Sequence, residues 1–545
     1  MAVTSRNAVL GPRAPTDELV PRGDGPRHAA GRPGNRPRGW LDAVLLVPLL
    51  VLAVVARRPG YLLSHAFWLD EGWVADSVRA PLHQLRMLSS STPIGWTLLL
   101  RLVPDMGPPE RLRMLPLAFG VASVVAAYLL GRQLGRVQAV AAGLAAALAP
   151  SMLRNHSLKQ YSADACVTVL LLWLGGRLAS RWSRWRLAAF CLACPPAVLL
   201  SHVTVFVSVA VLGALWLQAL AGRRWRRLGW VTAAGLAVAG VEGAAYLAFA
   251  DAGNGAIMQR WWAADFVPVE AGLGTAASFL GARSADALER VGFGPWPLAA
   301  ALAVCGLVAL WRARLGVVAA AVGILAAELV VAGALDRYPF LDERTSVFFT
   351  SLLTVCAALG VGSAIAWSAR RLTTAPLGIA AAVAACGLLL PAARAGALHP
   401  MPPSTVRQQV QHVLAHRQPG DVVVVGAGAS FAFGYYWPER PTFNPATART
   451  AVLFQVDYPG RDDLVVVDQK DARTIGDAMR LAAARSGSGR VWVVLADAGD
   501  RSPGWRPAIA EVGRVVHPVL PKLVELRQPP STRAGRASSY SKSLV

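Results

Sequence analysis

The sequence predicts a polytopic α-helical membrane protein of about eleven transmembrane helices, with a small extracytoplasmic α/β domain near its C-terminal end. Three observations predict this fold class. Of the 545 residues, 54% are hydrophobic, and apolar runs of about bilayer length recur as far as residue 393. Arginines gather in alternate connections between these runs. After residue 394 the runs give way to short Val-rich segments that alternate with amphipathic ones.

The charge and the cysteines exclude two other classes. A net charge of +22 would favour nucleic-acid binding in a soluble protein, but here much of the basic excess lies between apolar runs. Membrane orientation explains that excess, so no nucleic-acid partner is expected. All six cysteines lie within apolar runs, which implies no disulfide framework. The pair Cys191 and Cys194 lies inside a predicted membrane helix and is expected to pack there.

The predicted membrane helices share a nearly continuous apolar stretch. Their ranges are 40–56, 112–131, 137–151, 161–177, 187–200, 203–221, 228–249, 296–311, 315–335, 347–367 and 375–393. Residues 1–39, rich in Arg, Pro and Gly, are predicted to form a disordered basic cytoplasmic tail that lies against anionic lipid headgroups. Residues 40–393 form the predicted transmembrane domain.

Alternate connections differ in charge, and the positive-inside rule therefore orients the chain. The connections expected in the cytoplasm carry arginines, at Arg132 and Arg136, Arg177 to Arg186, Arg223 to Arg227, Arg312 and Arg314, and Arg370 and Arg371. The other set is then extracytoplasmic, together with everything after residue 394. The sequence thus predicts a multi-pass protein of the cell membrane with a cytoplasmic N-terminus and an extracytoplasmic C-terminal domain.

The segment 394–527 has the pattern of a small α/β domain. Val-rich strands are predicted at 421–426, 464–468 and 491–495, and helices near 404–416, 472–485 and 505–514. The glycines of 426–430 follow the first strand, but the full dinucleotide-binding pattern is absent, so a tight strand-to-helix turn is expected there. Residues 528–545, rich in Ser and Arg, are predicted to be a disordered tail.

Two adjacent carboxylates, Asp70 and Glu71, follow the first membrane helix and are flanked by Trp68 and Trp73. Tryptophan favours the membrane–water boundary. Neighbouring residues of a helix point about 100° apart, so we expect one carboxylate to act as a base or metal ligand while the other holds structure. The alternative is a solvated loop. Helical apolar spacing at 73–88 and 94–103 predicts two surface helices in the same loop.

Two other outer loops carry candidate anion ligands. Lys159 and Tyr161 could hold an anionic headgroup, although an interfacial aromatic residue beside a snorkelling lysine explains them equally well. Arg344 enters a membrane helix from the side that disfavours arginine, so it needs a partner. Phosphate suits a guanidinium group. The alternative is an ion pair with Asp342, or with a carboxylate of the first outer loop such as Glu71.

Four more polar residues are candidates for lining an outward cavity. His156 and His202 lie in outer loops, although a lone histidine such as His202 is more often structural. Glu242 and Glu328 lie in the outer halves of two predicted membrane helices, where a buried acid needs a partner.

These residues resemble a known family, the integral-membrane glycosyltransferases of GT-C fold, which include protein O-mannosyltransferases, lipid A aminoarabinose transferases and bacterial relatives. The resemblance rests first on Leu69-Asp70-Glu71 in the first outer loop. It is supported by segments that share the family's spacing: Ser91-Thr92-Pro93, Gln160-Tyr161, Tyr338-Pro339-Phe340 with Arg344, and Tyr435-Tyr436-Trp437.

The resemblance implies transfer of a sugar from a polyprenyl-phosphate donor to a hydroxyl of a cell-envelope glycan, lipid or protein on the outer face, with inversion. Asp70 would be the catalytic base, and Glu71 is the second candidate for that role. Arg344 and Lys159 would bind the lipid phosphate, assisted by Tyr161 and Arg337. No cofactor is required, and a divalent metal at Asp70 and Glu71 is compatible with the residues, although the sequence offers no full ligand set.

Two other classes of function fit the same topology. A transporter or flippase for a lipid-linked glycan would favour internal repeats and polar sites at the membrane midplane, and the sequence has no convincing repeat. A non-catalytic envelope assembly protein would act through its C-terminal domain. Turnover of a polyprenyl-phosphate sugar by the purified protein would separate the glycosyltransferase from both.

Overall fold

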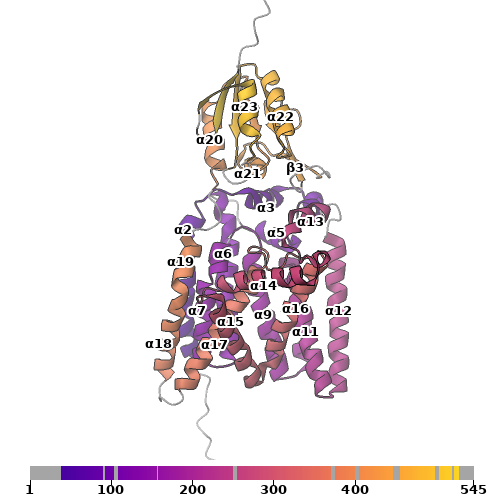
Figure 1. The fold of residues 1–545 in the computed structure, drawn as a ribbon, viewed down its shortest axis with the longest axis vertical. Helices are drawn as coiled ribbons and strands as arrows, with labels where there is room; N and C mark the ends of the chain where they lie inside the picture. Colours follow the sequence, from indigo (N-terminus) through magenta and orange to yellow (C-terminus); the bar gives the residue numbers. More distant parts are fainter. Residues whose placement is uncertain are drawn as a thin grey trace, which may run out of the picture.

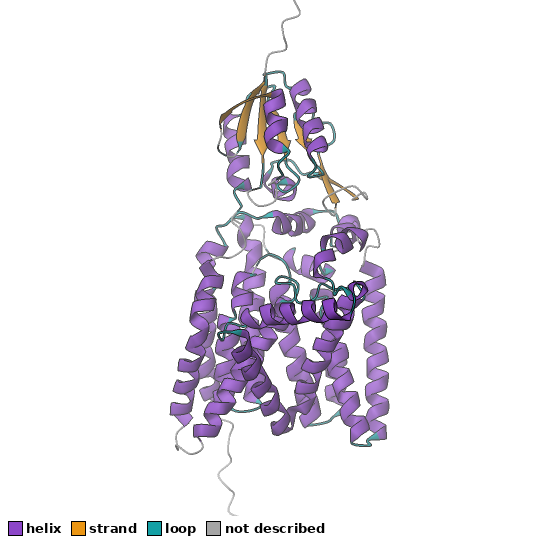
Figure 2. Ribbon diagram, viewed as in Figure 1, coloured by secondary structure: helices purple, strands orange, loops and turns teal. Residues whose placement is uncertain are grey.

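The computed structural model consists of a bundle of long helices with an α/β domain at one end (Figures 1 and 2). It describes residues 39–89, 92–103, 108–155, 157–249, 255–369, 375–398, 404–445, 454–496, 502–517, 519 and 521–526. The two predicted tails, 1–39 and 528–545, lie outside these residues, apart from Gly39, which begins the first helix.

The bundle is built from helices that match the predicted ranges. They are α1 (Gly39–Ala56), α6 (Met114–Arg132), α7 (Arg136–Leu148), α8 (Pro150–Arg154), α9 (Tyr161–Ser180), α10 (Arg184–Leu200), α11 (Thr204–Ala221), α12 (Trp225–Phe249), α15 (Trp296–Leu310), α16 (Gly316–Ala334), α17 (Val347–Ala369), α18 (Ala375–Cys386) and α19 (Leu390–Leu398). Each of the eleven predicted ranges overlaps at least one of these helices. The last range extends beyond the predicted end at residue 393, because α19 continues to Leu398.

Among the described residues, nine helical stretches are long and apolar enough to cross a membrane. One of them, the 39-residue stretch Trp296–Ala334, contains both α15 and α16, which the structure separates by a bend at Arg314 with φ of 64°. The helix α10 has 17 residues, just below the length of the nine. Close backbone contact supports the bundle: a Cβ at Gly306 of α15 would lie 1.9 Å from the Cys356 carbonyl of α17.

Helix ends far apart in the sequence meet at the same end of the bundle. Residues at the start of α9, before α11, after α16 and before α17 all line one cavity, described below. The connections at the other ends of α9 and α11 carry the arginine clusters. The structure therefore brings the predicted outer loops together and away from those clusters, as the alternating charge pattern requires.

Further helices, most of them short, connect the long helices of the bundle, and α14 among them runs across the long helices (Figure 1). They are α2 (Pro59–Leu62), α3 (Leu69–Arg79), η1 (Leu82–Gln84), α4 (Leu85–Leu88), α5 (Ile94–Leu100), η2 (Pro109–Arg113), α13 (Gly255–Trp261), η4 (Ala263–Asp265), η5 (Val269–Ala271) and α14 (Leu273–Glu289). The predicted helix 73–88 was wrong in its start and continuity: α3 begins at Leu69, so Asp70 and Glu71 lie in its first turn, and it ends before Pro81. The helices α13 and α14 were not predicted.

The C-terminal domain is a five-stranded sheet with helices on both faces. Its strand order is β4-β1-β5-β7-β6, in which β1 (Val422–Val425) pairs in parallel with β4 (Leu464–Val466) and β5 (Arg490–Val494). The strands β6 (Gly513–His517) and β7 (Lys522–Leu526) extend the sheet in antiparallel fashion. The predicted strands and helices are present, the helices as α20 (Val406–His416), α22 (Ala472–Arg485) and α23 (Trp505–Val512).

Five elements of this domain were not predicted. They are α21 (Ser430–Tyr436), β2 (Thr442–Pro445), β3 (Phe454–Asp457), β6 and β7. The glycines at 426–430 form the predicted turn between β1 and α21, and all five residues are buried. The turn leads directly into the helix that packs against the bundle, so it serves the contact between the two domains.

The two domains meet where α21 lies on α3 (Figure 1). Gly72 allows this approach, because a Cβ there would lie 2.5 Å from the backbone nitrogen of Ala432. Arg79 donates a hydrogen bond of 2.7 Å to the Tyr435 carbonyl, and its guanidinium lies 3.6 Å from the Tyr435 ring centroid. The C-terminal domain is therefore packed against the helix that carries the two predicted carboxylates.

Candidate active site

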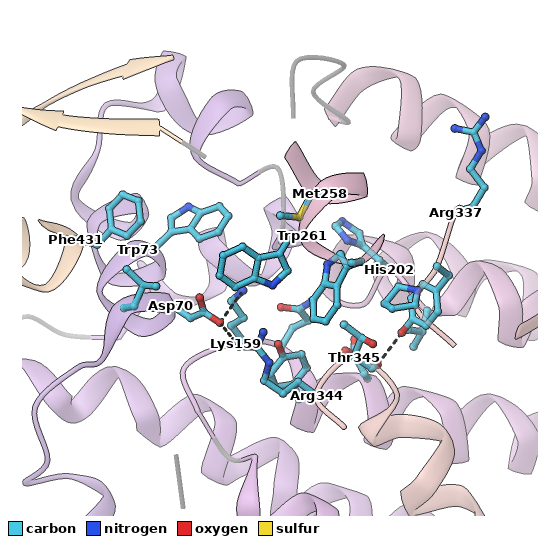
Figure 3. A pocket seen from close by; sticks show the side chains of 18 residues that line it. Asp70, Trp73, Lys159, His202, Met258, Trp261, Arg337, Arg344, Thr345 and Phe431 are labelled. Atoms are coloured by element: carbon cyan, nitrogen blue, oxygen red, sulfur yellow. Dashed lines mark hydrogen bonds and ion pairs between the residues drawn. The ribbon is translucent and has the colours of Figure 1, made fainter. Parts of the chain in front are cut away.

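A cavity of about 280 Å³ lies between the end of the bundle and α21. Its lining combines charged, aromatic and polar side chains from loops that are distant in sequence: Leu69, Asp70, Trp73, Lys159, Gln160, Tyr161, Asp164, His202, Val203, Met258, Trp261, Trp262, Arg337, Tyr338, Pro339, Arg344, Thr345 and Phe431. Figure 3 shows Asp70 facing Lys159 and Arg344, while Phe431 of the C-terminal domain lies beside Trp73. Residues from both domains thus form one site.

Asp70 is held between two cations. Its Oδ2 atom accepts a hydrogen bond of 2.9 Å from Arg344 Nη1 and lies 3.4 Å from Lys159 Nζ. The Asp70 side chain keeps 14% of its surface exposed, so the carboxylate remains accessible from the cavity. Asp70 is one of the first-loop carboxylates that the sequence gives as alternative partners of Arg344. The backbone N–H of Arg344 donates to Asp342 Oδ1 at 3.0 Å.

Burial and charge act differently on the two cations. Burial lowers the pKa of Lys159 below its ordinary value, and the nearby Asp70 carboxylate offsets only part of this shift. Burial also lowers the pKa of Arg344, but the neighbouring acidic groups, Asp70 foremost, together outweigh it, so the Arg344 pKa lies above its ordinary value. Arg344 therefore stays charged at every pH of interest, whereas Lys159 is the more easily deprotonated of the two.

Glu71 points away from the cavity into the protein. Its side chain is 3% exposed and accepts two hydrogen bonds from Arg113, of 2.8 Å from Nε and 2.5 Å from Nη2. The backbone N–H of Leu158 donates to the same carboxylate at 2.9 Å. Glu71 thus fixes the residue that precedes Lys159, and its oxygens are occupied by structural partners.

The pair Asp70 and Glu71 does not fit a shared metal site, because each carboxylate binds different cations on a different side of α3. Within the described ranges, no group of three or more His, Cys, Asp or Glu side chains is arranged to hold a metal ion. The prediction of Glu71 as a reserve base also conflicts with its burial and its bidentate pairing with Arg113.

The remaining predicted site residues divide between cavity and surface. Tyr161 begins α9, is 6% exposed and lines the cavity. His202 also lines it, with an exposed ring. Arg337 touches the cavity rim, but its side chain is exposed and in Figure 3 its guanidinium points away from Asp70. Arg337 therefore does not join the cluster around Asp70 as expected.

The two membrane acids lie elsewhere in the bundle. Glu242 is 4% exposed and accepts a hydrogen bond of 2.7 Å from Ser208 on the neighbouring helix α11. Glu328, on α16, has both carboxylate oxygens buried without a hydrogen-bond partner in the described part of the chain. Neither residue lines the cavity, which contradicts their predicted place. His156 lies outside the described residues.

Several site residues were missed by the sequence analysis. Arg113 is the partner of Glu71, and it could have been suspected because it is an arginine at the outer end of a membrane helix, as Arg344 is. Asp164 and Trp262 line the cavity beside predicted residues. Phe431 had no local signal, since only the contact between the domains brings it to the cavity.

The fold resembles solved membrane glycosyltransferases. The oligosaccharyltransferase of Archaeoglobus fulgidus, solved with Zn and sulfate, superposes with a TM-score of 0.51 at 13% identity, covering 83% of this chain and 68% of that chain. The same organism's AglB, in complex with an inhibitory peptide and a dolichol-phosphate, gives a TM-score of 0.51 at 12% identity, covering 84% and 69%. ArnT from Cupriavidus metallidurans in the apo state gives 0.49 at 14% identity, covering 89% and 97%.

The chain therefore has the GT-C fold that its sequence predicts. Comparison of the sequence with models of protein families and with curated proteins finds no match.

Proposed function

We propose that the protein is a membrane glycosyltransferase that moves a sugar from a polyprenyl-phosphate donor to an acceptor hydroxyl on the extracytoplasmic face. The observation that carries the proposal is the cluster of Asp70, Arg344 and Lys159 in one cavity at the end of the membrane bundle. It combines a proton acceptor with two groups that bind phosphate, and the reaction needs both.

The structural neighbours support a lipid-linked donor. One of them, AglB, was solved with a dolichol-phosphate and an inhibitory peptide. A dolichol-phosphate is a polyprenyl phosphate, so its presence on a protein of this fold supports the same donor class here. The acceptor class, a glycan, lipid or protein of the cell envelope, is set by whatever reaches the cavity from the outer side.

The proposed reaction is a single displacement. The acceptor oxygen bonds to the anomeric carbon of the donor while the bond from that carbon to the phosphate oxygen breaks. The hydroxyl proton passes to the Asp70 carboxylate, and the bond electrons leave with the phosphate. Arg344 and Lys159 stabilise the charge on the departing polyprenyl phosphate. Attack opposite the leaving group inverts the anomeric centre.

Binding of the donor would change the pairing of Asp70. Arg344 and Lys159 are paired with Asp70 in this structure, and a phosphate entering the cavity would compete for the same donors. The carboxylate is then left with an acceptor hydroxyl as its partner. In this scheme Glu71 takes no part in the chemistry, and it holds Leu158 and hence Lys159 in position.

Purified protein incubated with synthetic polyprenyl-phosphate sugars tests the proposal. We expect release of polyprenyl phosphate from at least one donor in the presence of an acceptor. Arg344→Ala should weaken donor binding by roughly tenfold or more, and Arg344→Lys by less. Arg154→Ala is the matched control, because Arg154 pairs with Glu343 in the same region but its side chain is 54% exposed. A transporter or an assembly protein would bind or move the donors without cleaving them.

The proposed orientation has its own test. Single cysteines at Arg473, exposed on the C-terminal domain, and at Arg224, in an arginine cluster, differ in the side of the membrane they should face. An impermeant thiol reagent should label the first and not the second in intact cells. Labelling at position 224 alone would reverse the orientation and place the cavity on the cytoplasmic side.

A further inference from the structure

Two hydrogen-bond acceptors in the cavity have no hydrogen-bond partner among the residues that the structure describes. Asp164 is 3% exposed, and within that part of the chain its Oδ1 atom is buried without a hydrogen bond. Gln160 is 7% exposed, and its Oε1 atom is likewise buried and unpaired. Both residues line the cavity, and four positions apart at the start of α9 they share one helix face. Buried acceptors without donors are costly, so native proteins seldom keep them without a reason.

Among the described residues, no cation that lines the cavity is paired with Asp164. The cations that line the cavity near α9 are Lys159 and Arg344, and both are paired with Asp70. Arg337, the third, is turned away at the rim (Figure 3). The Ser201 hydroxyl interacts with the Asp164 carboxyl group, but among the described residues it leaves the Oδ1 atom without a hydrogen bond of good geometry. A ligand in the cavity can therefore supply donors to Asp164 and to Gln160. Hydroxyl groups fit, because each donates one hydrogen bond to an acceptor of this kind.

Aromatic side chains complete the surroundings. Trp261 and Trp262 line the same cavity, and Trp261 keeps half of its surface exposed. An indole face can pack against the apolar C–H surface of a bound ligand, and the acceptors at the start of α9 can accept hydrogen bonds from hydroxyl groups of the same ligand. The Trp262 ring centroid lies 5.5 Å from the Arg344 guanidinium carbon. Trp262 thus lines the same cavity as the two acceptors and lies beside Arg344, the proposed phosphate ligand. A sugar that is bonded to the donor phosphate would occupy this position.

We propose that Gln160 and Asp164, with Trp261 and Trp262, form the subsite that holds the transferred sugar, and that Asp164 selects a neutral sugar through its hydroxyl groups. The inference rests on the proposed function. It adds the residues that recognise the sugar as distinct from those that bind the phosphate.

The experiment compares two ligands on the full-length protein: farnesyl phosphate, and a panel of farnesyl-phosphate hexoses, pentoses and amino sugars. Wild-type protein should bind at least one neutral member more tightly than farnesyl phosphate. Asp164→Asn should reduce that preference by roughly tenfold, the scale of a lost buried hydrogen bond, and leave the affinity for farnesyl phosphate unchanged. Gln160→Met, which removes an acceptor while conserving length, should reduce it by about threefold.

The control is Glu242→Gln, which alters a buried acid of the same bundle outside the cavity and should leave both affinities as they are. Equal weakening of both ligands by Asp164→Asn and by Gln160→Met would make these residues structural and overturn the subsite. Tightest binding by an amino sugar would overturn the neutral class, because an ammonium group would then be the partner of Asp164. Failure of the proposed function has a different signature: farnesyl phosphate itself would not bind, or would bind independently of Arg344.

Discussion

The helix α3 carries three carboxylates in three different settings. Asp70 faces the cavity, is paired with two cations and remains accessible. Glu71, the next residue, is buried against Arg113 on the other side of the helix. Asp76 is buried at the contact with the C-terminal domain, and its Oδ2 atom has no hydrogen-bond partner in the part of the chain that the structure describes. The comparison teaches that direction on the helix, and not residue type, decides which carboxylate is accessible from the cavity.

The largest expected effect is on stability, at the buried pair. Glu71→Gln leaves the Arg113 guanidinium 4% exposed and without its counter-charge. Removing one partner of a buried ion pair costs about 3 kcal/mol of unfolding free energy. We expect a clear fall of the unfolding midpoint in detergent. Arg154→Ala, which breaks an exposed pair, should cost less than about 1 kcal/mol. If Glu71→Gln were as stable as wild type, Glu71 would have no structural role, and the proposed difference between Glu71 and Asp70 would be wrong.

The next effect concerns catalysis at Asp70. Asp70→Asn conserves shape but removes proton acceptance, so turnover should fall by roughly a hundredfold or more. The unfolding midpoint should fall by less than it does in Glu71→Gln, because the Asp70 and Arg344 side chains are 14% and 22% exposed, although the buried Lys159 also loses its counter-charge. The measurement is initial rate at saturating donor, with the unfolding midpoint taken on the same preparation. Near-normal transfer would end the role of Asp70 as base, and parallel loss of donor affinity would make it a binding residue.

Much of this site could be predicted from sequence. Asp70, Lys159, Tyr161 and Arg344 lie on alternate connections, and the positive-inside pattern puts such connections at one end of a bundle. Proximity at one end follows from topology alone. The opposite directions of Asp70 and Glu71 do not follow, because they depend on where α3 starts. The apolar spacing indicated a start at Trp73, whereas Glu71 caps the helix from within its first turn.

The unpredicted parts depend on contacts between distant segments. Phe431 reaches the cavity because α21 packs on α3 across Gly72. Neither segment has a local pattern that encodes this contact. The helix α14 was missed for a related reason: with 17 residues and mixed polarity, it resembles a loop when only membrane spans are sought. Periodicity indicates that a helix exists, and packing decides what it faces.

A smaller effect, on pH dependence, sharpens the comparison of the two cations at Asp70. Burial lowers the pKa of Lys159, and a lysine is charged only below its pKa. Donor affinity should therefore start to fall at a lower pH than an exposed lysine would allow. Lys159→Arg should keep the charge and flatten the affinity between about pH 7 and about pH 10. The expected loss in wild type across this range is roughly threefold to tenfold. Identical profiles for both proteins would mean that Lys159 does not carry phosphate affinity.

The smallest expected effect is at Asp76, the third carboxylate of α3. Burial raises its pKa well above the ordinary value, and Arg79 offsets only part of the shift. An acid whose pKa is higher in the folded state contributes stability that is complete below its unfolded pKa and is lost as pH rises through the folded pKa. Wild-type protein should thus lose stability from acid toward alkaline pH.

Asp76→Asn resembles the protonated acid in shape and charge, so it should remove this loss and raise the unfolding free energy by about 1 kcal/mol at neutral pH. Unfolding midpoints measured across the pH range for both proteins check it. The two curves should meet in acid and diverge with rising pH. Parallel curves would mean that Asp76 is ionised in the folded protein with a partner of its own, and the contrast with Glu71 on the same helix would disappear.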